Sequence, residues 1–198
     1  MSRYFPHTPY AEDQPLAHTI LTTHVATRAV TLGTLLGVTV TSARTIIPAL
    51  RPKASPQPPF AARLLRSCAG SIVATLGITG IGLVARMWGR EHIEWQDRSW
   101  RLLENKGQLE TDDWTYVGMG AATAAALVVM SRTATAATAA ASGGAGKPVV
   151  ATLGWRGVLG AAGLGSVGGM MGYMGWRYGV NGGKFPEKLA KKEERTGL

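Results

Sequence analysis

The chain has 198 residues, a net charge of +9 and a pI near 10.1, and 45% of its residues are hydrophobic. Its single cysteine, Cys68, excludes a disulfide framework and a thiol metal site within one chain. The basic residues lie at the ends of apolar segments rather than on one face with aromatic readers, so we expect no nucleic-acid binding. Membrane lipids are the partner that this charge favours.

Residues 1–15 form a polar tail punctuated by prolines. The tail holds one arginine and two acidic residues, Glu12 and Asp13, whereas a cleavable mitochondrial presequence is Arg-rich and acid-poor. It also lacks the basic start and apolar run of a secretory signal. We therefore expect internal targeting and a tail that remains on the mature chain.

The first apolar segment covers about residues 16–47, with its most apolar part between Arg28 and Arg44. Roughly 20 mainly apolar residues suffice to cross a bilayer, so this segment is a predicted span. Gly33 and Gly37 lie four residues apart in it. Arg28 allows two interpretations: its side chain snorkels to the membrane surface, or it pairs with an acid of a neighbouring subunit.

A connection with five prolines, residues 48–59, predicts a short extended link. The second predicted span, residues 67–85, carries no charge and places Gly70 and Ala74 four residues apart. We interpret Cys68, within this span, as a small packing residue.

The next segment, residues 86–113, carries charges of both signs. On a helical wheel, residues 88–105 separate into a charged half and an apolar half that holds Trp88, Trp95 and Trp100. We therefore predict an amphipathic helix. Its tryptophan face lies either in the lipid headgroup layer, where tryptophan is enriched, or against a partner protein.

The third predicted span, residues 114–131, is free of charge and aligns Gly118 with Ala122. Residues 133–148 are rich in alanine, threonine, serine and glycine and indicate a connection. As an alternative, the third helix extends from Ala134 to Ala141.

The fourth predicted span, residues 157–176, is also free of charge and is followed by a charged tail, residues 181–198. Small residues recur in it at every fourth position: Gly157, Ala161, Gly165 and Gly169. Because lipid tails are as apolar as leucine, helices in a membrane associate through close backbone contact, which such rows permit. Each glycine costs a helix about 1 kcal/mol relative to alanine, so the row indicates a packing role.

Together these segments predict an all-α membrane protein with four transmembrane helices, Gly/Ala-rich packing faces and one interfacial amphipathic helix. We assign residues 16–180 to a single membrane domain. The alternative is a soluble domain of four alanine-rich helices. The scarcity of charges within the spans argues against it, because a soluble helix carries a charged face.

The loops predict an orientation. The connections at residues 44–66 and 132–156 contain basic residues and no acids, whereas residues 86–113 hold both. By the positive-inside rule, the two basic connections face the matrix and both termini face the intermembrane space.

Four short Gly/Ala-rich spans, rows such as Gly157/Ala161/Gly165/Gly169 and basic inner connections resemble the superfamily of mitochondrial inner-membrane translocase channel subunits. Within it, the chain more closely resembles the small four-span accessory subunit of respiratory complex I, as found in fungi. The resemblance covers roughly residues 16–180. The insert at residues 86–113 and the five-proline connection depart from a minimal translocase pattern.

The resemblance implies a non-catalytic accessory subunit of mitochondrial NADH:ubiquinone oxidoreductase in the inner membrane. Such a subunit braces core and accessory membrane subunits of complex I and holds lipid between them. We expect no catalytic residue, no metal site and no cofactor, and bound phospholipid is compatible with this role. A component of an inner-membrane protein translocase is the alternative, and a small solute transporter is a third class.

Overall fold

The computed structural model describes residues 4–50, 58–139 and 149–183, and this part of the chain is helical, without strands. Most of the predicted C-terminal tail, residues 181–198, lies outside it. The main helices are α1 (Ala17–Ile46), α2 (Phe60–Met87), α3 (His92–Glu104), α4 (Lys106–Ala139), α5 (Val149–Leu153) and α6 (Trp155–Met174). Short 3-10 helices cover Ala11–Asp13 and Pro48–Leu50, and a π-helix, Gly175–Val180, continues α6.

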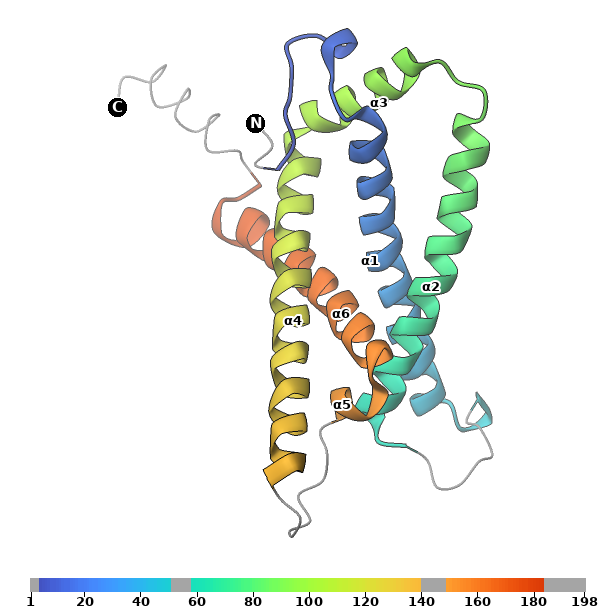
Figure 1. The fold of residues 1–198 in the computed structure, drawn as a ribbon, viewed down its shortest axis with the longest axis vertical. Helices are drawn as coiled ribbons and strands as arrows, with labels where there is room; N and C mark the ends of the chain where they lie inside the picture. Colours follow the sequence, from blue (N-terminus) through green and yellow to red (C-terminus); the bar gives the residue numbers. More distant parts are fainter. Residues whose placement is uncertain (1–3, 51–57, 140–148, 184–198) are drawn as a thin grey trace, which may run out of the picture.

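The four long helices form a bundle in which α6 lies between the others. Helix α1 packs along α2, while α4 packs along α6. Figure 1 shows α6 crossing the bundle obliquely, from the lower part of α2 to the upper part of α4. The start of α1, the end of α2, the start of α4 and the end of α6 all lie at the end that carries α3 (the α3 end). Helix α5 lies at the opposite end (the α5 end).

Glycines bring α6 against α4. A Cβ atom on Gly165 would lie 2.5 Å from the Ala122 Cβ and even closer to the Gly118 carbonyl oxygen. A Cβ on Gly169 would lie 3.1 Å from the Thr115 Cα. Because these distances leave no room for a side chain, the structure bears out close backbone packing at these predicted positions.

A second glycine face of α6, which the sequence analysis did not identify, meets the other helix pair. A Cβ on Gly160 would lie 2.5 Å from the Leu65 carbonyl oxygen of α2. A Cβ on Gly163 would lie 2.6 Å from the Ile72 Cδ1 and still closer to the Thr34 hydroxyl of α1. Glycines on two sides of α6 therefore let one helix contact both pairs.

The contact between α1 and α2 combines small residues with hydroxyl groups. A Cβ on Gly37 would lie 2.5 Å from the Cys68 Cα, and one on Gly33 would lie 2.7 Å from the Ile72 Cα. Cys68 is fully buried, as expected of a packing residue. The Thr75 hydroxyl donates across the contact to the Ala29 carbonyl at 2.9 Å. Such hydrogen bonds add to the packing of helices in lipid.

Two predicted packing residues of α2 do not serve this contact. Gly70 and Ala74 are both exposed, and a Cβ on Gly70 would meet no atom of the described residues within 4 Å. They face outward, because the inward face of α2 is the one with Leu65, Cys68 and Ile72, and their packing against another helix stays a prediction. Gly157 is close-packed, but its neighbour is Val150 of the short helix α5. Ala161 is half-buried.

Three helices are long and apolar enough to cross a membrane: α1, α2 and the Lys106–Arg132 part of α4. Helix α4 extends to Ala139, which supports the helical alternative for residues 134–139. Helix α6 has 20 residues but is not among the three, so the fourth span is not confirmed. Glycine occupies many of its positions and contributes backbone contact rather than apolar surface.

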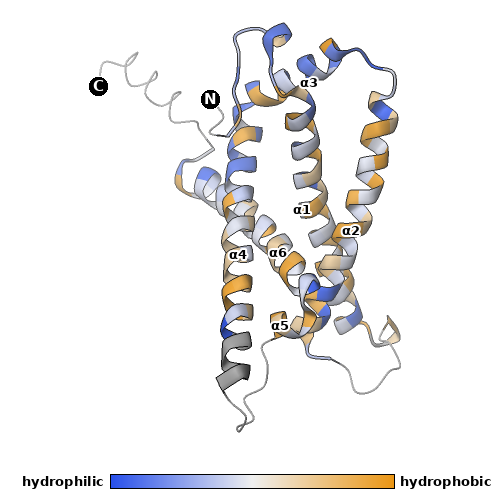
Figure 2. Ribbon diagram, in the orientation of Figure 1, coloured by the Kyte–Doolittle hydropathy of each residue, from blue (hydrophilic) through white to orange (hydrophobic). Residues whose placement is uncertain are grey.

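Figure 2 shows hydrophobic residues, in orange, along the long helices. Many of their side chains are exposed on the outside of the bundle. Among the exposed ones are Leu32, Leu35, Leu36, Val40, Val73, Ile78, Ile81, Val84, Val117, Leu127, Val128 and Val129. An apolar exterior of this extent, together with the lengths of the helices, is typical of a protein in contact with lipid.

The acidic residues of the described chain all lie at the α3 end: Glu12, Asp13, Glu91, Glu94, Asp97, Glu104, Glu110, Asp112 and Asp113. The helix ends near α5 carry Arg44, Arg63, Arg66, Arg132 and Arg156. The two ends of the bundle therefore differ in charge.

Candidate functional site: a charged cluster and a docked N-terminal segment

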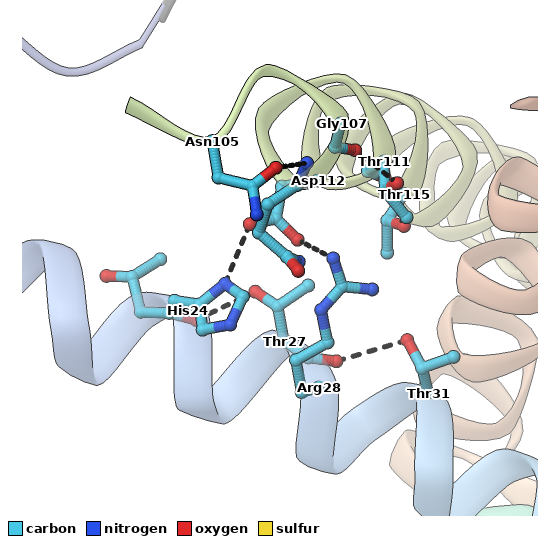
Figure 3. Close-up of polar contacts among 11 residues, drawn as sticks. His24, Thr27, Arg28, Thr31, Asn105, Gly107, Thr111, Asp112 and Thr115 are labelled. Atoms are coloured by element: carbon cyan, nitrogen blue, oxygen red, sulfur yellow. Dashed lines mark hydrogen bonds and ion pairs between the residues drawn. The ribbon is translucent and has the colours of Figure 1, made fainter. Parts of the chain in front are cut away.

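A charged cluster at the α3 end joins α1 to α4. The Asp112 carboxylate of α4 is buried and accepts from Arg28 through Oδ1 and from His24 through Oδ2, the latter at 2.7 Å (Figure 3). An ionised carboxylate can only accept, so the hydrogen bond to ionised Asp112 requires a proton on His24 Nδ1. Arg28 also faces the Gln108 amide, whose oxygen, turned toward it, accepts from Nε at 3.0 Å.

The cluster settles how Arg28 is held. The sequence offered snorkelling or a pair with another subunit, and the structure shows neither as the main contact. The partner is Asp112 of the same chain, 84 residues away. The Arg28 side chain keeps 29% of its surface exposed, whereas the Asp112 side chain keeps 7%. An arginine beside an apolar span thus meets an internal counter-ion, as intramembrane charges generally do.

Local sequence explains why these groups meet. His24 and Arg28 are four residues apart on α1 and therefore share a face. Helix α4 begins at Lys106, eight residues before the predicted start of the third span, so Asp112 belongs to the helix rather than to a loop. The Asn105 side chain accepts from the Gln108 backbone N–H at 3.2 Å, which caps the start of α4.

The N-terminal segment, residues 4–16, is docked on α3 rather than free. The buried Gln14 side chain donates to the Pro6 carbonyl at 2.8 Å. Two side chains of α3 hold the segment from the other side: Trp100 Nε1 donates to the Thr8 carbonyl at 2.9 Å, and Gln96 Nε2 donates to the Glu12 carbonyl at 2.6 Å. The expected polar tail is thus part of the fold.

The tryptophan face of α3 is covered largely by the chain itself. The Trp95 ring lies 4.1 Å, centroid to centroid, from the His18 ring of α1, and the Trp100 ring stacks at 5.6 Å on His7. This face was expected against lipid or a partner; Trp95 and Trp100 are half-buried here, and contact of their remaining surface with lipid or a partner stays a prediction. Helix α3 begins at His92, so Trp88 does not belong to it; Trp88 follows the last residue of α2 and is 79% exposed.

One face of α2 is exposed within the described part of the chain. Its exposed residues recur with the three- and four-residue periodicity of one helix face: Gly70, Val73, Ala74, Gly77, Ile78, Ile81 and Val84. This spacing aligns them on one side of the helix, and we term them the α2 outer stripe. Gly70 and Ala74 thus lie on an outward surface that combines small residues with β-branched ones.

The sequence reasoning identified Arg28 and missed Asp112, His24 and Gln96. Two features of the sequence could have indicated Asp112 and His24. His24 lies four residues before Arg28, and Asp112 is an acid next to an apolar span. In the described residues no three His, Cys, Asp or Glu side chains lie close enough together to hold a metal ion. The cluster holds two helices together through charge and hydrogen bonds.

Comparisons of the chain with protein-family models, with curated proteins and with solved structures found no match.

Proposed function

We propose that the protein is a non-catalytic accessory subunit of mitochondrial complex I, which braces neighbouring membrane subunits. The observation that carries the proposal is the α2 outer stripe. Its small residues, Gly70, Ala74 and Gly77, lie beside Val73 and Ile78 and face away from the bundle. Glycine weakens a helix, so glycines that the bundle does not use favour close contact with a helix of another subunit.

The rest of the molecule supports a bracing role. The α3 end is held by internal polar contacts, and glycine packing joins α6 to both helix pairs. Such a bundle offers a neighbouring subunit a preformed surface. In this proposal α6 is the fourth span and the membrane is the mitochondrial inner membrane. The basic α5 end faces the matrix and both termini face the intermembrane space.

The proposal is tested by replacing Gly70 and Gly77 with leucine in the tagged, full-length protein. Bulky side chains there leave the bundle intact, because each position opens onto empty space within the described chain. They push a partner helix away, so the protein should separate from NADH dehydrogenase activity on a native gel of solubilised mitochondria. Leucine at Gly120, which is open in the same way on α4, is the matched control and should stay with the activity.

Two results would count against the proposal. If the wild-type protein does not migrate with NADH dehydrogenase activity, it is not a subunit of complex I. If the Gly70→Leu/Gly77→Leu variant left complex I intact but stopped import of presequence-bearing precursors, the translocase alternative would replace it.

A further inference from the structure

A cavity of about 300 Å³ opens at the α3 end, where the N-terminal segment, the start of α4 and the end of α6 meet. We term it the boundary pocket. Its lining consists of Tyr4, Glu110, Asp113, Trp114, Val117 and Trp176. Its volume is at the lower limit of small-molecule sites in proteins.

The pocket has a polar part and an apolar part arranged along α4. Glu110, Asp113, Trp114 and Val117 follow one another at helical spacing and share one face. Trp114 is the first residue of the predicted third span, and Trp176 is the last of the predicted fourth. The two carboxylates therefore lie on the water side of this boundary, the indoles at it, and Val117 on the hydrocarbon side.

The two indoles form a continuous aromatic wall. The Trp114 and Trp176 rings stack with centroids 6.0 Å apart and planes at 30°. Both are only partly covered, at 38% and 37% exposed, so they offer ring surface to a ligand. A quaternary or primary ammonium group is attracted to the face of a tryptophan, and a carboxylate reinforces that attraction.

We propose that the boundary pocket binds the ammonium headgroup of a zwitterionic phospholipid, a phosphatidylethanolamine or a phosphatidylcholine. The carboxylates of Glu110 and Asp113 and the indole wall receive the ammonium group, while the acyl chains run along Val117 into the hydrocarbon. Arg177, which directly follows Trp176 in the chain and donates to the Tyr173 hydroxyl, provides the positive charge that the lipid phosphate needs. The inference rests on the proposed membrane placement and is independent of the assembly that the protein joins.

The charge of the pocket selects among membrane lipids. Two carboxylates repel the headgroup of phosphatidylglycerol, which has a phosphate but no ammonium group. Zwitterionic lipids combine both charges, so they match a surface with Glu110 and Asp113 on one side and Arg177 nearby. The pocket should therefore discriminate against phosphatidylglycerol, although the protein as a whole is basic.

The experiment measures lipid retained by the purified full-length protein, using native mass spectrometry after exchange into nanodiscs. The nanodiscs contain equal amounts of phosphatidylcholine and phosphatidylglycerol with identical acyl chains. We expect one phosphatidylcholine to be retained in preference to phosphatidylglycerol, by about tenfold. Soluble phosphocholine should not displace it, because the apolar part of the site adds to lipid binding. Equal retention of both lipids, or displacement by phosphocholine, would overturn the proposal.

Variants locate the retained lipid. Trp114→Leu/Trp176→Leu removes the aromatic wall, and Glu110→Gln removes one charge with little change of shape; each should lower the preference about tenfold. Trp114→Phe keeps an aromatic face and should retain most of the preference for phosphatidylcholine. Trp88→Leu is the matched control, because this exposed tryptophan lies at the end of α2, outside the pocket. Unchanged preference in folded Glu110→Gln, or a loss in Trp88→Leu as large as in the pocket variants, would place the lipid elsewhere.

Discussion

Asp112 on α4 accepts hydrogen bonds from two residues one turn apart on α1, His24 and Arg28. Apart from this cluster, α1 and α4 have little direct contact, because each packs mainly on a different neighbour. The cluster therefore fixes how the α1/α2 pair and the α4/α6 pair are aligned at the α3 end.

Removing one partner of the Arg28–Asp112 ion pair should destabilise the bundle more than removing both partners. Asp112→Leu leaves Arg28 without its counter-ion at the edge of an apolar span and should cost about 3 kcal/mol of unfolding free energy. Arg28→Leu/Asp112→Leu together should cost less than either single change. Thermal unfolding in detergent measures this. Arg101→Leu, which breaks an exposed pair with Asp97, is the control and should change stability by about 0.5 kcal/mol at most. Additive losses in the double variant would contradict this account.

Two glycines of α6 should respond in opposite ways to alanine. Gly165 touches Gly118 and Ala122, so Gly165→Ala forces α6 away from α4 and should lower the unfolding temperature. Gly168 faces open space, and Gly168→Ala should raise helix stability by about 1 kcal/mol. The measurement is thermal unfolding of the two purified variants in the same detergent. Equal effects of both changes would show that α6 is not packed through Gly165.

The N-terminal segment should be released when its anchors on α3 are removed. Gln96→Leu deletes the donor to the Glu12 carbonyl, and Trp100→Leu deletes the donor to the Thr8 carbonyl and the ring that stacks on His7. Each lost hydrogen bond contributes about 1 kcal/mol, so loss of both should let chymotrypsin cleave after Tyr10 about thirtyfold faster in the double variant.

Trp88→Leu is the comparison for that experiment, because Trp88 is exposed and does not hold the segment. If cleavage after Tyr10 is as fast in the wild type as in the double variant, the segment is not docked in solution.

The orientation can be measured with single cysteines in a Cys68→Ala background. Glu91→Cys reports the α3 end and Arg132→Cys the basic α5 end, and both positions are exposed. On intact mitoplasts, a membrane-impermeant maleimide should label Glu91→Cys at once and Arg132→Cys only after permeabilisation. The reverse pattern would invert the topology, and labelling of both in intact mitoplasts would show that α4 does not cross the membrane.

Much of the architecture could be predicted because it depends on local patterns. Apolar length predicted helices that correspond to α1, α2 and α4, each long and apolar enough to cross a membrane. The amphipathic pattern predicted α3 to within four residues at its start. The glycine rows at Gly33/Gly37 and Gly165/Gly169 were recognised as contact faces because small residues at helical spacing have few other uses in lipid.

Tertiary structure alone decided which surfaces meet. A row of small residues has the same appearance in sequence whether it faces inward, as Gly165 does, or outward, as Gly70 does, because the pattern does not specify the partner. Arg28 and Asp112 pair across 84 residues, and the docking of Thr8 on Trp100 spans 92. Such contacts depend on how the helices assemble. The sequence by itself determined the helices and their apolar lengths, whereas only the packed bundle decided the partner of each face and charge.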